Sequence, residues 1–224
     1  MIVTIDGPAG AGKSSVAKTL AQRLGFRFLD TGAMYRAVTL AAVQAGFDWR
    51  HTERLAELAR RLSIELRGGR VWLDGEDVSE AIRTSAITGL VYHAANNSAV
   101  RHQLVELQRR AAADQDVVTE GRDQGTVVFP HAECKVFLTA SPAERARRRM
   151  LDLQSRGEQL TFDEVLAQQT LRDERDASRD VGPLLKADDA IEFLTDGLTP
   201  EQVVERLERL VRERLAKFQP SAAI

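Results

Sequence analysis

The segment Gly7–Ser14 restricts the possible fold of this chain more than any other part of its sequence. It matches the pattern G-x-x-x-x-G-K-[S/T], in which a glycine-rich loop is followed by a lysine and a hydroxyl residue. An apolar run over 2–5 precedes the motif, and Val16, Leu20 and Leu24 follow it at the four-residue spacing of a helix face. Glycines let successive N–H groups turn toward one point, and the start of the helix adds its positive dipole end. The sequence therefore predicts a strand, a phosphate-binding loop (P-loop) and a helix that together bind a nucleoside triphosphate.

The loop supplies the predicted contacts to that triphosphate, which are Gly7, Pro8, Ala9, Gly10, Ala11, Gly12, Lys13, Ser14 and Ser15. We expect Lys13 to reach the β- and γ-phosphates, and the hydroxyl of Ser14 to bind Mg²⁺. A carboxylate at the end of another strand is the common partner of such a metal. Both Asp30 and Glu120 follow candidate strands, and the choice between them stays open. Asp6 is interpreted as part of the turn that leads into the loop.

Four further apolar runs have the length of a strand: 26–29, 116–119, 135–138 and 191–194. Short continuous runs of this kind are typical of strands buried on both faces of a parallel sheet. Helical patterns separate them, over 14–24, from Pro142 through 145–153, and onward from Pro200. The alternation predicts an α/β fold of the P-loop NTPase kind, with a parallel sheet flanked by helices.

Two segments interrupt this alternation. Strand-like residues over 63–67 and 71–73 flank Gly68-Gly69, which predicts a β-hairpin, and we interpret 63–84 as a small β-insertion. The segment 154–180 is rich in charge and has only a weak apolar stripe, so we interpret it as a poorly packed, mobile lid. The predicted core of a single domain over 1–224 then consists of 1–62, 85–153 and 181–224.

The composition argues against several other kinds of protein. The chain has 31 basic and 33 acidic residues, a formal charge of −2, and 43% apolar residues. The apolar content argues against a disordered chain. The small net charge argues against a protein that binds nucleic acid or a membrane surface through a general basic field. Cys134 is the only cysteine, which excludes an intramolecular disulfide and a cysteine-based zinc site. We find no secretory leader pattern and no apolar run near the roughly 18 residues of a membrane span, so we expect a cytoplasmic protein, acting as a monomer.

Two other strand ends carry basic motifs. The run 29–36 follows a strand and opens a helix with Arg36 one turn in, and the run 116–123 ends a strand just before Arg122 and Asp123. Because a doubly wound sheet binds ligands at the carboxyl ends of its strands, we expect both arginines at that edge. A second phosphate-binding position favours a kinase over a nucleotide-dependent switch, which has no need of one.

Five motifs together resemble those of the bacterial cytidylate (CMP) kinases: Gly7–Ser15, Asp30–Arg36, Gly121–Pro130, Arg147–Met150 and Arg172–Asp176. The resemblance runs from the first strand to the last helix and so covers essentially the whole chain. It implies a build similar to adenylate kinase, with a P-loop core, a nucleoside monophosphate (NMP)-binding insertion enlarged by a small β-sheet, and a lid.

The resemblance also implies which residues bind CMP: Thr31, Arg36, Tyr92, Arg101, Arg122, Asp123, Arg172, Asp176 and Arg179. Arg36, Arg101 and Arg122 match the family's contacts to the CMP phosphate. Thr31 stands at its Ser/Thr position near the base and ribose.

On the lid side, Arg172 and Arg179 match arginines of the family, and Asp176 matches the acid that holds the ribose. The catalytic set that this implies is Lys13, Arg122, Arg172 and Arg179.

Recognition of the base is assigned to two positions. Asp123 matches the family's reader of the cytosine amino group, and a carboxylate does accept a hydrogen bond from cytosine N4, whereas uracil presents an oxygen there. Tyr92 stands where the family has a second, serine reader. Glu120 is a smaller departure, because aspartate is the familiar residue at that position.

The implied reaction is ATP + CMP → ADP + CDP with Mg²⁺, and dCMP is the expected second acceptor. The attacking phosphate oxygen is already ionised, so catalysis needs positioning and charge neutralisation rather than a general base. A kinase for UMP or another nucleoside monophosphate, and a non-catalytic P-loop switch, are the alternatives. At least one residue of the run Arg145, Arg147, Arg148 and Arg149 is expected to contact nucleotide, and the sequence does not say which.

Overall fold

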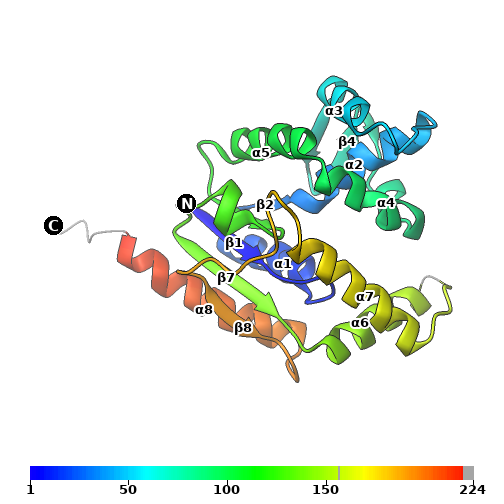
Figure 1. Ribbon diagram of the computed structural model, residues 1–224. Helices are drawn as coiled ribbons and strands as arrows, with labels where there is room; N and C mark the ends of the chain where they lie inside the picture. Colours follow the sequence, from blue (N-terminus) through cyan, green and yellow to red (C-terminus); the bar gives the residue numbers. More distant parts are fainter. Residues whose placement is uncertain (156, 219–224) are drawn as a thin grey trace. The chain divides into compact units, whose positions relative to one another are not determined.

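The computed structural model describes residues 1–155 and 157–218, which form two compact units (Figure 1). One unit contains residues 1–28 and the described residues from 115 onward, and the other contains residues 29–114. Among the described residues, no helix combines the length and the apolar character needed to cross a membrane.

A five-stranded sheet with the order β2-β6-β1-β7-β8 organises the first unit. Its strands are β1 (Ile2–Asp6), β2 (Arg27–Asp30), β6 (Val117–Glu120), β7 (Cys134–Thr139) and β8 (Ile191–Leu194), and β2 crosses the boundary between the units. Strand β1 pairs in parallel with β6 and β7, and β7 pairs in parallel with β8. Val3, Thr4 and Ile5 are fully buried, as the central strand of a parallel sheet requires. The predicted strands and the α/β fold class are confirmed.

The helices of this unit are α1 (Lys13–Leu24), α6 (Pro142–Ser155), α7 (Phe162–Ala177) and α8 (Pro200–Phe218). Val16 and Leu20 of α1 and Leu207 of α8 pack with Ile5 and Val136 of the sheet in the main core. Burying the apolar face of α1 against the sheet fixes the loop between β1 and α1, which is the P-loop.

Helix α7 occupies most of the segment predicted to be a poorly packed lid, and the prediction of poor packing is wrong. The helix begins with a capping box, in which Thr161 and Glu164 satisfy each other's backbone N–H groups. Val165 packs with Ala146 and Leu153 of α6 in a small buried cluster. Figure 1 shows α6 and α7 running side by side. A lid role for this segment stays a prediction.

The second unit contains helices α2 (Thr31–Gln44), α3 (Thr52–Arg61), α4 (Ser85–Asn96) and α5 (Ser98–Ala112), with a short 3₁₀ turn η1 (Ala81–Arg83). Two apolar clusters hold it together, one around Val38, Leu55 and Leu104, the other around Leu73 and Ile82.

The predicted hairpin lies in this unit and is formed by β3 (Ile64–Arg67) and β4 (Arg70–Leu73), which pair antiparallel. Gly68 and Gly69 both have positive φ, 60° and 73°, which a two-residue turn of this type requires. A short third strand, β5 (Glu76–Asp77), pairs with β4. The compact unit around the hairpin extends well beyond 63–84.

Candidate active site

The P-loop has the backbone conformation that its glycines predict. Gly12, at the N-cap of α1, has a φ of 88°, in the left-handed region that only glycine adopts readily. Gly7 has a φ of 146° and lies so close to β7 that an added Cβ would stand 1.9 Å from the carbonyl oxygen of Leu138. Any larger residue at position 7 would push the loop away from the sheet.

Lys13 is buried inside the loop, with an exposed fraction of 5%. Its ammonium donates a hydrogen bond of 2.7 Å to the carbonyl oxygen of Pro8. Burial, and then the positive charges of Arg122 and Arg172, lower the pKa of Lys13 to about 7, against the opposing effect of nearby carboxylates. The lysine thus stands in a positive field that an anion would relieve.

Ser14 and Glu120 lie together beside the loop. The Ser14 hydroxyl donates a hydrogen bond of 2.7 Å to a carboxylate oxygen of Glu120, which is buried at the end of β6. A hydroxyl and a carboxylate are the oxygen donors that Mg²⁺ prefers, so this pair fits a magnesium site. Asp30 instead caps α2, where its carboxylate accepts from the Ala33 N–H at 2.9 Å. The structure therefore favours Glu120 as the acidic partner.

Asp6 does not belong to the turn into the P-loop, which corrects the prediction. Its carboxylate accepts hydrogen bonds from the backbone N–H groups of Gln124 at 2.9 Å and Gly125 at 2.7 Å. These bonds fix the start of the π-helical turn η2 (Gln124–Val128), directly after Arg122 and Asp123. Burial raises the pKa of Asp6 to about 7, although the two N–H groups and Lys13 lower it.

Three predicted site residues form one ion cluster in the first unit. A carboxylate oxygen of Asp176 lies 2.6 Å from Nε of Arg122, and the other oxygen is paired with Arg179. Although burial raises the pKa of Asp176, the charges of Arg122, Arg179 and Arg172 lower it overall. Because the charges of Arg122 and Arg172 also act on Lys13, the structure gathers the predicted catalytic residues at the P-loop. Asp123 is buried beside them, 4% exposed.

The second unit holds another predicted group around the start of α2. Thr31 is its first residue, and Arg36 lies one turn on, 3.4 Å from Asp30. The Nε of Arg36 is buried and has no hydrogen-bond partner among the described residues, so it is a donor available to an anion. Arg83 of η1 also binds Asp30, at 3.1 Å. Arg83 could not be predicted from the sequence, because its partner lies 53 residues away and no local motif marks it.

Tyr92 and Arg101 lie in α4 and α5 of the same unit. The ring of Tyr92 packs on His93 at 4.0 Å, and His93 stacks on Trp49 at 4.5 Å between ring centroids. Arg101 is almost fully buried, with its guanidinium 5.6 Å from the ring centroid of Tyr35. Both predicted residues are thus held by aromatic contacts.

The structure distinguishes the four arginines of α6 by their contacts, which the sequence does not do. Arg147 and Arg149 form ion pairs with acids of their own helix, Glu144 and Asp152. Arg145 is buried and donates to the P-loop, at the carbonyl oxygen of Ala9, over 3.1 Å.

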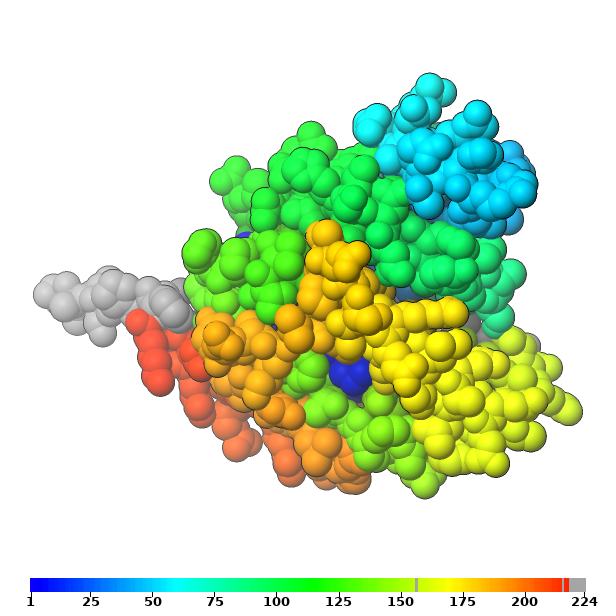
Figure 2. All heavy atoms as spheres, in the orientation of Figure 1, coloured from blue at the N-terminus to red at the C-terminus, as the bar shows by residue number. Residues whose placement is uncertain are grey.

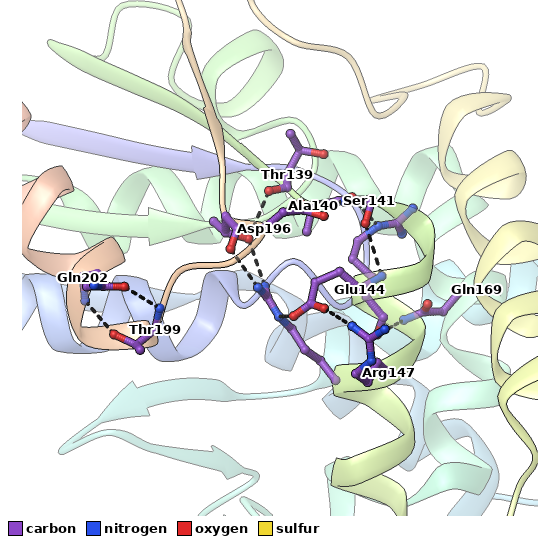
Figure 3. A network of polar contacts seen from close by, with 12 residues as sticks. Thr139, Ala140, Ser141, Glu144, Arg147, Gln169, Asp196, Thr199 and Gln202 are labelled. Carbon is purple, nitrogen blue, oxygen red and sulfur yellow. Dashed lines mark hydrogen bonds and ion pairs between the residues drawn. The ribbon is translucent and has the colours of Figure 1, made fainter.

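Arg148 lies next to the P-loop as well. It donates to the hydroxyl and the carbonyl oxygen of Thr195, both at 2.9 Å, and a Cβ added to Gly12 would lie 3.9 Å from it. Figure 3 shows the surrounding polar network, in which Asp196 accepts from the backbone of Ser141.

The N-terminal segment that carries the P-loop is accessible from outside. Figure 2 shows its dark-blue atoms at the bottom of a hollow between green, yellow and orange segments of the same unit. A parallel sheet whose first strand runs into a P-loop, with partly buried arginines gathered beside the loop lysine, defines the class of P-loop kinases.

Comparisons with known proteins give the family. The sequence model described as cytidylate kinase matches residues 3–213. The chain is 52% identical over 213 residues to a cytidylate kinase of Rhodopirellula baltica, which covers 95% of this chain and 93% of that protein. A cytidylate kinase of Geobacter sulfurreducens is 48% identical and covers 96% and 94%. The chain belongs to the cytidylate kinase family.

Among solved structures, an uncharacterised protein from Eubacterium ventriosum has a TM-score of 0.52 at 11% identity, covering 95% of this chain and 98% of that one. At that identity the likeness concerns the fold alone.

Proposed function

We propose that this protein transfers the γ-phosphoryl group of ATP to CMP, and to dCMP as a second acceptor, with release of ADP. Membership of the cytidylate kinase family supports this reaction. The observation that carries it is the cluster of Lys13, Arg122, Asp176 and Arg179 at the P-loop, because a protein that only bound ATP would not need further partly buried arginines beyond the loop.

The ATP site is assigned to the P-loop residues 7–15. Their N–H groups and the start of α1 would hold the phosphates, and Lys13 would lie on the β- and γ-phosphates. Ser14 and Glu120 would hold Mg²⁺, which would neutralise part of the charge of the phosphates. Arg148, whose Nη1 lies 3.9 Å from the position that a Cβ of Gly12 would take, would contact the rest of the nucleotide.

The CMP contacts are assigned, on the family resemblance, to Thr31, Arg36, Tyr92, Arg101, Arg122, Asp123, Arg172, Asp176 and Arg179. The unpartnered Nε of Arg36 supports its assignment to the phosphate of CMP. The assignment of Asp123 as base reader rests on the family resemblance and on the ability of a carboxylate to accept a hydrogen bond from cytosine N4.

Transfer proceeds by attack of an ionised CMP phosphate oxygen on the γ-phosphorus. The new P–O bond forms as the bond to the bridging oxygen breaks, and that oxygen leaves on ADP. No proton has to be removed, so the residues act by neutralising charge and aligning the two phosphates. Lys13 meets the charge on the transferred group and the leaving oxygen, while Arg122, Arg172 and Arg179 meet it from the acceptor side.

A coupled assay for ADP formation, run with CMP, dCMP, UMP and AMP in turn, tests the proposal. We expect CMP to have the highest kcat/KM, with CDP identified chromatographically as the product. Equal kcat/KM values for all four acceptors would show that the enzyme does not recognise cytosine. Slow ATP hydrolysis that no acceptor accelerates would indicate a nucleotide-dependent switch instead.

Replacing Asp123 by alanine is expected to weaken the binding of CMP and to reduce the preference for CMP over UMP by roughly 10-fold, because the hydrogen bond between the carboxylate and cytosine N4 is lost. The measurement is the ratio of kcat/KM for the two substrates. A parallel Asp189→Ala variant is the control, because Asp189 is exposed and pairs with Lys135 on the far end of β7. An unchanged ratio in Asp123→Ala would show that another residue reads the base.

The lowered pKa of Lys13 predicts that ATP binding takes up a proton. Above pH 7 the free lysine is largely neutral, and the triphosphate requires its charged form, so affinity should fall by up to about tenfold per pH unit. Calorimetry at pH 8.5 in buffers of different ionisation enthalpy would measure the uptake, which we expect to approach about one proton. The Lys13→Met variant should take up none. If the wild type also takes up none, Lys13 is charged before ATP arrives.

A further inference from the structure

Arg145 is a buried cation whose contacts connect separate parts of the first unit. Only 6% of it is exposed. Its Nε donates to the carbonyl oxygen of Ala140 at 3.0 Å, and its Nη1 donates both to the carbonyl oxygen of Ala9 at 3.1 Å and to the carboxylate of Asp173 at 2.5 Å. Ala9 belongs to the P-loop and Asp173 to α7, so one guanidinium joins the two.

A second contact at the same place involves Gln169, one turn before Asp173. Its side-chain amide donates to the backbone carbonyl oxygen of Arg145 at 3.2 Å. A Cβ added to Gly10 would lie 2.5 Å from that amide nitrogen and 3.2 Å from Cβ of Arg145. The P-loop, α6 and α7 thus meet with no space between them, and Figure 3 shows Gln169 reaching from α7 toward α6.

Helix α7 carries functional side chains immediately beyond this contact. Arg172 precedes Asp173, and Asp176 lies about one turn on. Asp176 lies 2.6 Å from Nε of Arg122, so α7 contacts an arginine of the proposed catalytic set. A small shift of α7 against the loop would move Arg172 and Asp176 together.

We propose that Arg145 and Asp173 are positioning residues, whose ion pair holds α7 in register with the P-loop. The triphosphate is then aligned with the arginines that neutralise the transferred phosphoryl group. The inference rests on the proposed role of Arg172. Arg147 and Arg149 differ from Arg145, because each pairs with an acid of α6 itself.

The central experiment replaces Asp173 by asparagine, which keeps the shape of the side chain and removes its charge. We expect kcat for CDP formation to fall about 10- to 100-fold, the range for misplacing catalytic groups by an ångström or less. The KM for ATP should change by less than about threefold, because the P-loop donors remain. Asp152→Asn breaks the partly exposed pair with Arg149 and is the matched control, with an expected change in kcat of less than about twofold.

A double-mutant cycle with Arg145→Lys separates positioning from general stability. Lysine keeps the charge but lacks the fork that reaches Ala9, Ala140 and Asp173 together. If the two residues act as one unit, the double variant should lose no more activity than the worse single variant. The proposal would be overturned if the fold-losses in kcat of the two single variants multiplied in the double variant, or if the kcat of Asp173→Asn stayed within about threefold of wild type. It would also be overturned if the loss of kcat followed the fall in Tm and disappeared at assay temperatures well below the Tm of the variant.

Hydrogen exchange gives a readout that does not depend on turnover. In the wild type, ATP should slow exchange of the backbone amides over 162–177, because the loop and α7 are tied together. In Asp173→Asn the same ATP should protect the P-loop but leave α7 unprotected. If the wild type made no CDP, the proposed function would be wrong, but hydrogen exchange would still test whether the ion pair connects the P-loop with α7. Equal protection of α7 by ATP in both proteins would show that the ion pair does not couple ATP binding at the P-loop to α7.

Discussion

Replacing Lys13 by methionine is expected to lower kcat for CDP formation by about 10²- to 10³-fold, as does loss of one preorganised donor at a developing charge in other enzymes. Lys13 is buried and fixed by the carbonyl oxygen of Pro8, so no flexible surface cation can take its place. Methionine keeps the length and the apolar stem, and the P-loop glycines retain their conformation. ATP should bind more weakly as well, because the lysine contacts it before and during transfer.

The control for this variant is Lys18→Met, which removes an exposed lysine from the same helix. Its kcat and KM should match those of the wild type. Initial rates of CDP formation, with thermal denaturation to confirm folding, distinguish the two variants. A Lys13→Met enzyme within about tenfold of wild type would mean that Arg122 and Arg172 neutralise the transferred group without the lysine.

Features set by contiguous residues could be predicted from the sequence. The P-loop, its strand and its helix follow from Gly7–Ser14 and its flanks, because each glycine has a conformational task within a few residues. The hairpin follows from Gly68-Gly69 in the same way. The five strands of the sheet are recognisable because parallel strands are buried on both faces and read as short apolar runs.

Features set by residues far apart in the chain could not be predicted. Asp6 fixes a turn 118 residues away, and nothing near Asp6 indicates that partner. Arg145 lies in a run of arginines whose sequence suits a solvated helix face, yet its contacts with the P-loop and α7 bury it. Burial of a charge depends on where its partners fold, and that information is not local.

The error about α7 has a different cause. Its apolar stripe is weak because the helix buries only a narrow face on α6, through Val165 and a few neighbours. Its polar contacts, from Gln169 and Asp173 to Arg145, do the rest of the packing. Hydrophobic periodicity measures only the first kind of contact, whereas the Thr161 and Glu164 capping box was the available signal for a helix start.

Replacing Arg122 by alanine is expected to lower kcat for CDP formation by roughly 10³-fold, the lower end of the effect of an arginine that neutralises a transferred phosphoryl group. Arg122 lies at the centre of the ion cluster, since it both pairs with Asp176 and adds positive charge beside Lys13. Its removal takes a cation from the phosphates and leaves Asp176 paired with Arg179.

Unlike Lys13→Met, this variant should not weaken ATP binding. The charge of Arg122 lowers the pKa of Lys13, so its loss raises that pKa and keeps the lysine charged at higher pH. ATP affinity should therefore be nearly unchanged at pH 7 and less dependent on pH above it. Calorimetric titration with ATP alone, beside steady-state rates with CMP, measures the two effects separately. Arg147→Ala, which removes an exposed arginine of α6, supplies the control. If Arg122→Ala weakened ATP as strongly as Lys13→Met does, Arg122 would belong to the ATP site rather than to the acceptor side of the reaction.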